Sequence, residues 1–166
     1  VYVMIIPALP AIASLMGQVL VGLSIGFAIA QVVVAYLVGL AVVFVMSFVG
    51  NELAGAFGGT KNHVQATKIA VYAATPGWIV GILAVVPQLA LLIILLGFLA
   101  ILYGAFLIYL GATPVMKIPE DKAIVYAIVM FVAWIVISWI LLLFVAGIVL
   151  STLGFGMMAA GGMPRY

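Results

Sequence analysis

Residues 89–111 read LALLIILLGFLAILYGAFLIYLG, a run without a single charged side chain. A helix that crosses the hydrocarbon core of a bilayer needs about 20 consecutive apolar residues, so this stretch is typical of a transmembrane helix. Pro87 precedes the run and Thr113-Pro114 follows it. Because proline disfavours a continuous helix, we expect a tight turn at Pro87 and an end to the helix before Pro114.

The rest of the chain has the same character. Of its 166 residues, 70% are hydrophobic and 5% are charged, whereas an average soluble domain has about 25% charged residues. A soluble domain of this size could not cover its surface with so few charges, which leaves the class of polytopic membrane proteins. The absence of cysteine excludes disulfides, a thiolate nucleophile and a Cys-ligated metal.

Four further apolar stretches are separated by turns or charged loops. We expect helices at about residues 1–16, 27–50, 69–86 and 123–150, in addition to 89–111. The prediction is an all-α fold, a bundle of five transmembrane helices in a single domain at residues 1–156, followed by a flexible Gly/Met-rich tail at 157–166. The first span is short and Val1 is not an initiator methionine, so we expect residues before Val1 in the natural protein.

Most of the charge lies in two loops, residues 51–68 after the second span and residues 112–122 after the fourth. The loop after the second span contains Gly55, Gly58 and Gly59, which indicate flexibility. The basic residues of these two loops outnumber the single one on the other side, with Lys61, Lys68, Lys117 and Lys122 against Arg165. The positive-inside rule therefore predicts cytoplasmic charged loops, a cytoplasmic N-terminus and an exported C-terminus.

Glycines at helical spacing mark candidate packing faces. Apolar helices gain little by associating in lipid, so close packing relies on small residues that let backbones approach. We expect the third and fourth spans to form a close hairpin along such residues, namely Gly77, Gly81, Gly97, Gly104 and Gly111.

Chemistry-bearing residues are few. No ionisable side chain lies at the centre of a span, and no nucleophile–base pair or pair of carboxylates is evident, so we expect no enzyme. Asn51, Glu52 and His63 form a weak cytoplasmic polar site, but a metal needs three or four ligands and a third is not evident. Solvated loop charges are the default interpretation there, and we expect neither metal nor cofactor. The small, dispersed net charge of +2 argues against nucleic acid.

A combination of motifs in the second half resembles the YIP (Ypt-interacting protein) membrane-domain family, in particular its small bacterial inner-membrane members. Tyr72-Ala73-Ala74-Thr75-Pro76 opens the third span and Pro87 closes it. Tyr103, the run Ile108-Tyr109-Leu110-Gly111 and the segment Lys117 to Ala123 follow. The similarity reaches back to Ile6-Pro7 in the first span and so covers most of the chain. The residues that it marks as a family-motif patch are Tyr72, Thr75, Pro76, Pro87, Tyr103, Tyr109, Gly111 and Lys122.

The resemblance implies five helices, a cytoplasmic N-terminal segment and a short exported tail, in the cell inner (plasma) membrane. Eukaryotic relatives reside in the Golgi and endoplasmic reticulum, are reported to contact Rab-type GTPases and are tied to vesicle traffic. That contact is attributed largely to cytoplasmic parts that this chain mostly lacks, and the bacterial members have no settled function. We therefore expect a non-enzymatic organising or accessory component that binds other membrane proteins or lipids, or associates with itself.

One alternative function stays open, a small permease for a neutral or lipidic substrate. It would need a polar cavity, with Tyr72, Thr75, Tyr103 and Tyr109 as its candidate lining.

Overall fold

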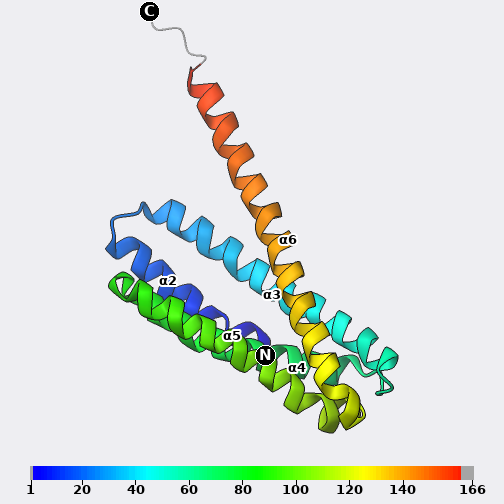
Figure 1. Ribbon diagram of the computed structural model, residues 1–166. Coiled ribbons are helices and arrows are strands. Elements are labelled where there is room, and N and C mark those ends of the chain that lie inside the picture. Colours follow the sequence, from blue (N-terminus) through cyan, green and yellow to red (C-terminus); the bar gives the residue numbers. More distant parts are fainter. Residues whose placement is uncertain (1, 162–166) are drawn as a thin grey trace, which may run out of the picture. The chain divides into compact units, whose positions relative to one another are not determined.

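The computed structural model describes residues 2–161, and the side chains of residues 2–147. The described part consists of helices joined by short connections (Figure 1). Their bounds are α1 Tyr2–Ile5, α2 Ala8–Leu20, α3 Ile25–Ala56, α4 His63–Gly81, the 3₁₀ helices η1 Ile82–Val85 and η2 Pro87–Leu89, α5 Ala90–Met116, and α6 Glu120–Gly161.

Five helical segments are long and apolar enough to cross a membrane, which confirms the predicted fold. They are Tyr2–Leu20, Ile25–Ala56, His63–Val85, Pro87–Met116 and Glu120–Gly147. The chain divides after Trp134 into two units, the second of which begins at Ile135 within α6. Helix α6 continues to Gly161 and so includes 157–161, the first part of the expected flexible tail. The remainder of that tail, 162–166, lies outside the described residues.

The end of α5 differs from the expectation. Pro114 lies inside the helix, which continues to Met116. Pro114 lacks the N–H that would donate to the Leu110 carbonyl, but its fixed φ suits a helix, so α5 accommodates it at the cost of one helical hydrogen bond. Lys117 then adopts the left-handed conformation, with φ 55°. The backbone N–H groups of Lys117 and Ile118 both donate to the Ala112 carbonyl and close the helix.

The α4–α5 hairpin is the most extensive helix pair of the first unit. Its closest approach is at Gly104, where an added Cβ atom would lie 2.5 Å from the carbonyl oxygen of Ala73. At Gly111 the corresponding position is 3.1 Å from the Cγ1 atom of Ile69. The missing side chains of these two glycines therefore allow the helices to approach closely.

The other glycines expected at this contact lie elsewhere. An added Cβ atom on Gly81 would lie 2.7 Å from the Cβ atom of Pro10 in α2, so this glycine faces α2 and not α5. Gly77 and Gly97 adjoin open space, since within the described part no neighbouring atom lies within 4 Å of an added Cβ. The structure therefore does not place them between α4 and α5, because even spacing along one helix does not say which stretch of it meets the neighbour.

Gly104→Ala should lower the free energy of unfolding by about 1–3 kcal/mol, because the new methyl group meets backbone that cannot rotate away. Gly104→Leu should lower it further. The quantity to measure is the midpoint of unfolding of the purified protein in mild detergent.

Gly97→Ala is the matched control, since it makes the same change on the same helix beside open space. We expect an unchanged or slightly raised midpoint for this variant. Equal midpoints for the two alanine variants would contradict the close contact at Gly104.

Candidate functional site

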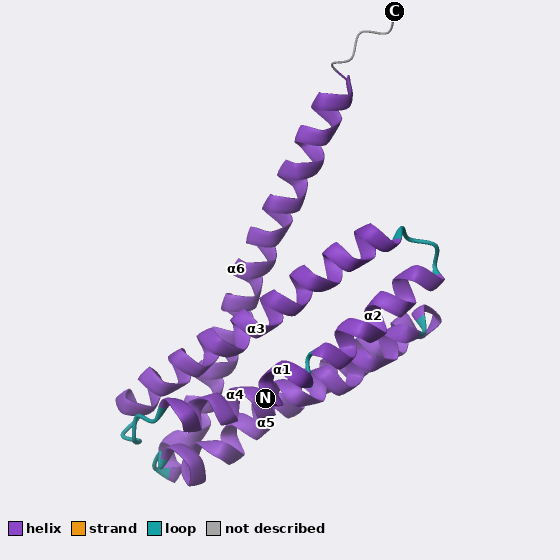
Figure 2. Ribbon diagram, turned by 180° about the vertical axis from the view of Figure 1, so that it is seen from behind, coloured by secondary structure: helices purple, strands orange, loops and turns teal. Residues whose placement is uncertain are grey.

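The two charged loops, residues 57–62 and 117–119, lie at the same end of the helices (Figure 2). The Thr60 N–H donates to the carbonyl of Met116 at 2.8 Å, and the Gly59 N–H donates to the carbonyl of Ala54 at the same distance. An added Cβ atom on Gly59 would lie 2.6 Å from the Met116 oxygen, so only glycine fits there without a shift. A short packed connection thus replaces the flexible loop that we expected from the glycines.

A buried aromatic contact lies beneath these loops. Tyr126 of α6 is fully buried, its hydroxyl donates to the carbonyl of Gly50 at 3.1 Å, and its ring meets Phe57 edge-on at 5.9 Å. Met116 and Ile118 are also buried almost completely. This end of the first unit is therefore well packed, while its charged side chains remain on the surface.

The predicted polar site at Asn51, Glu52 and His63 is only partly assembled. The Asn51 amide donates to one oxygen of the Glu52 carboxylate at 3.0 Å, and Lys61 forms an ion pair with the other. His63 takes no side-chain hydrogen bond with them. Among the residues searched, no group of three His, Cys, Asp or Glu side chains could hold a metal. Both charged partners are about half exposed, so this ion pair contributes little to stability.

The family-motif residues of α4 contact the first helix. The Thr75 hydroxyl donates to the Val71 carbonyl at 2.9 Å. The Tyr2 hydroxyl lies 3.2 Å from the Thr75 oxygen, and it must be the donor because the threonine proton is already engaged. The Tyr2 and Tyr72 rings are 6.2 Å apart. Pro76 follows within α4, where its missing N–H removes the helical donor of the Tyr72 carbonyl.

The two motif tyrosines of α5 share one face with a phenylalanine. The Phe106 ring lies 6.3 Å from the Tyr103 ring and 6.3 Å from the Tyr109 ring. All three side chains are exposed on the first unit, by 53%, 50% and 38% in chain order. We call these three residues the α5 ridge. No hydrogen bond or ring contact in the described part joins it to Tyr72 or Thr75.

The remaining motif residues, Pro87, Gly111 and Lys122, lie at a turn, at a helix contact and beside a loop. Pro87 is the first residue of η2, at the turn into α5. Gly111 faces Ile69 in the hairpin. The Lys122 ammonium reaches over the first charged loop, 3.9 Å from an added Cβ on Gly58, and the Lys122 N–H donates to the Pro119 carbonyl at 2.9 Å.

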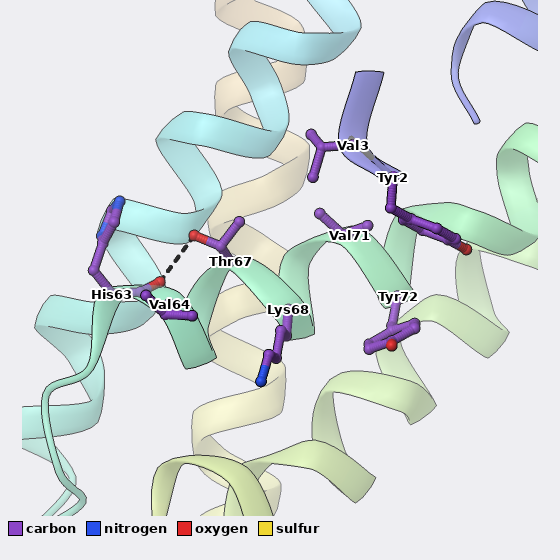
Figure 3. Close-up of a pocket in the computed structure, with 8 residues that line it drawn as sticks. All are labelled: Tyr2, Val3, His63, Val64, Thr67, Lys68, Val71 and Tyr72. Carbon is purple, nitrogen blue, oxygen red and sulfur yellow. Dashed lines mark hydrogen bonds between the residues drawn. The ribbon is translucent and has the colours of Figure 1, made fainter. Parts of the chain in front are cut away.

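A groove of about 300 Å³ runs along α4 beside the start of the first helix (Figure 3). We call it the α4 groove; it is lined by Tyr2, Val3, His63, Val64, Thr67, Lys68, Val71 and Tyr72. Most of its surface is apolar, and the Thr67 hydroxyl is turned to the His63 carbonyl at 2.8 Å. Its volume is at the lower end of the range for small-molecule sites, about 300–1,000 Å³.

Sequence reasoning missed Tyr2, Phe106 and Tyr126. Phe106 could have been found, because it lies three residues from Tyr103 and three from Tyr109 and so must share their helix face. Tyr126 could not, since its partner Gly50 is 76 residues away and neither residue marks the other.

Tyr126→Phe should lower the free energy of unfolding by about 1 kcal/mol, because it removes one buried hydrogen bond and leaves the ring in place. Unfolding in detergent measures the loss. The control is Tyr109→Phe, which removes a hydroxyl on the exposed ridge and should leave stability unchanged. If the two variants unfold alike, the buried bond contributes nothing.

Comparison with known protein families shows which family the chain resembles. The model of the Yip1 domain matches residues 1–142, which include the first four spans and most of the fifth. No curated protein and no solved structure matches the chain. The match covers well over half of the 166 residues and agrees with the resemblance in the tyrosine and proline motifs; the narrower bacterial inner-membrane type stays a prediction. The chain therefore belongs to the Yip1-domain family.

Proposed function

We propose that this Yip1-domain membrane protein is a non-enzymatic organising or accessory component that binds other membrane proteins through the α5 ridge. The family in general consists of non-enzymatic membrane proteins. The partner is a transmembrane helix, from another protein or from a second copy of this chain. The observation that carries the proposal is Tyr103, an exposed tyrosine at the centre of α5.

Tyr103 is the middle residue of α5, about 20 Å along the helix axis from Ala90 and from Met116. In a helix that crosses the bilayer this position is close to the midplane, far from water. Its side chain is 53% exposed. Within the described part of the chain, its hydroxyl has no hydrogen-bond partner. A hydroxyl left without a partner in an apolar medium costs about 1–3 kcal/mol.

A neighbouring helix would remove that cost. Polar side chains in membrane helices commonly form hydrogen bonds with another helix, and tyrosine combines such a group with a large apolar ring. Phe106 and Tyr109 extend the same face toward the charged end and add aromatic area for contact. The ridge thus combines an aromatic packing surface with one hydroxyl that lacks a hydrogen-bond partner. Lipid tails cannot supply such a partner.

The permease alternative has less support. Its four candidate lining residues separate into two groups, with Tyr72 and Thr75 at Tyr2 and with Tyr103 and Tyr109 at Phe106. Between the two helices that carry them, Gly104 lies against the backbone of Ala73. A close contact of this kind leaves no room for a substrate between α4 and α5 at that level.

The proposal includes an orientation. The charged loops and the first turns of the helices that follow them carry Lys61, Lys68, Lys117 and Lys122, so the positive-inside rule favours a cytoplasmic location for this end. The family resemblance favours the inner (plasma) membrane. The α5 ridge then spans from the bilayer centre toward the cytoplasmic leaflet.

The experiment is site-specific photocrosslinking in native membranes. With a benzophenone amino acid at position 106, the full chain should form a discrete protein adduct, whose partner mass spectrometry identifies. Adding Tyr103→Phe should lower the yield about threefold or more, because an interhelical hydrogen bond in membranes contributes about 0.6–2 kcal/mol.

The control is the same crosslinker at Ile101, an exposed residue at similar depth on the far side of α5. That position should label lipid and give no discrete protein band. Equal patterns at positions 101 and 106, or a yield at 106 that does not respond to Tyr103→Phe, would exclude the ridge as a binding face.

A further inference from the structure

We propose that the α4 groove binds one anionic phospholipid, with Lys68 at the phosphate and an acyl chain against Val71 and Tyr72. The groove shares no residue with the α5 ridge, so this inference goes beyond the proposed function and is independent of it. Three observations carry it: the arrangement of the lining along α4, the unpaired cation, and the depth of each group in the bilayer.

The lining forms a single stripe on α4. Val64, Lys68, Val71 and Tyr72 recur at intervals of four, three and one residues, which puts them on one helix face. Val71 is almost fully buried and forms the floor of the groove, whereas Tyr72 is exposed and forms a wall. The Tyr2 ring, 6.2 Å from the Tyr72 ring, closes the end that is farther from the charged loops.

Lys68 is the one cation suited to a ligand in this groove. In Figure 3 the Lys68 and Tyr72 side chains extend to the same side of α4, while the His63 ring points the other way. No carboxylate is among the groove's lining residues. Within the described part of the chain the ion pair is between Glu52 and Lys61, which leaves Lys68 without an acidic partner. An apolar groove beside a positive charge that has no acidic partner favours the binding of an amphipathic anion.

The depth of these groups matches a lipid that stands upright in its leaflet. Lys68 is about 8 Å along the helix axis from His63, where α4 begins, and Tyr72 is about 6 Å deeper. The head-group region is about 5–8 Å thick on each side of the hydrocarbon core. The ammonium therefore reaches the phosphate level, because lysine extends its charged end toward the interface. Val71 and Tyr72 lie at the level of the acyl chains.

The groove volume limits what is bound. About 300 Å³ holds part of one acyl chain and not a whole phospholipid, so the second chain remains in the bilayer. A soluble phosphate compound would leave the apolar floor exposed, and a zwitterionic lipid offers Lys68 a phosphate whose charge is already balanced by the lipid's own cation. An anionic phospholipid satisfies both, with about 1 kcal/mol expected from one lysine near such lipids.

Native mass spectrometry of the full chain in detergent, titrated with phosphatidylglycerol or phosphatidylcholine, tests the proposal. The wild-type chain should bind phosphatidylglycerol about fivefold more tightly than phosphatidylcholine. Lys68→Gln should abolish this preference. Val64→Trp, which places an indole in the groove at an exposed position, should weaken binding of both lipids. Both substitutions are at exposed residues, and the unfolding midpoint verifies that each variant is folded.

Lys117→Gln is the matched control, since it removes one exposed cation at the same end but outside the groove. It should bind like the wild type. The proposal is overturned if Lys68→Gln keeps the preference, if both glutamine variants lose it equally, or if Val64→Trp has no effect. Displacement of the lipid by excess inorganic phosphate would also overturn it, because it would show a phosphate site without a chain-binding groove.

Discussion

The contact between Gly104 and the backbone of Ala73 determines how close α4 and α5 lie, and the rest of the first unit is arranged around that pair. Helices in lipid gain little from hiding apolar surface, so dispersion contacts at short range must hold them together. Helix α4 also packs against α3 and α2. A change in the spacing of α4 and α5 would therefore be transmitted to the helices that contact α4.

Much of the fold was accessible from the sequence. Charge-free runs of sufficient length, interrupted by lysines and glycines, predicted five spans and their order, because a bilayer allows few other solutions. The helix ends were less accurate. Pro114 was expected to stop α5, but its fixed φ is compatible with a helix, which continues past it without the hydrogen bond to the Leu110 carbonyl. Residues 51–56 were expected to belong to a loop because they begin with Asn51 and Glu52 and contain Gly55, yet α3 continues through them to Ala56. Its 32 residues exceed the roughly 20 that a bilayer core requires.

The candidate sites were predicted only in part, for a different physical reason. Tyr72, Tyr103 and Tyr109 were recognised as motif residues, but a motif does not say which neighbour each residue meets. The structure assigns Tyr72 to the first helix and leaves the α5 tyrosines facing outward. The α4 groove depends on where Tyr2 and Val3 lie against α4, and such contacts between distant segments leave no trace in local spacing. Of its lining, only the residues on α4 share a helix face by their spacing, namely Val64, Lys68, Val71 and Tyr72.

The manner in which the two charged loops are joined has a consequence for how this surface can diversify. Their link consists of backbone atoms, from the Thr60 N–H to the Met116 carbonyl, with Gly59 fitted against them. The side chains of Lys117 and Glu120 are exposed and take no part in that link, whereas Lys61 pairs with Glu52 of α3. Substitutions at Lys117 and Glu120 can therefore alter the pattern of charge that the protein presents to the aqueous phase without loosening the helices beneath. Relatives that share this scaffold could differ in the soluble partners they attract while keeping the same membrane core.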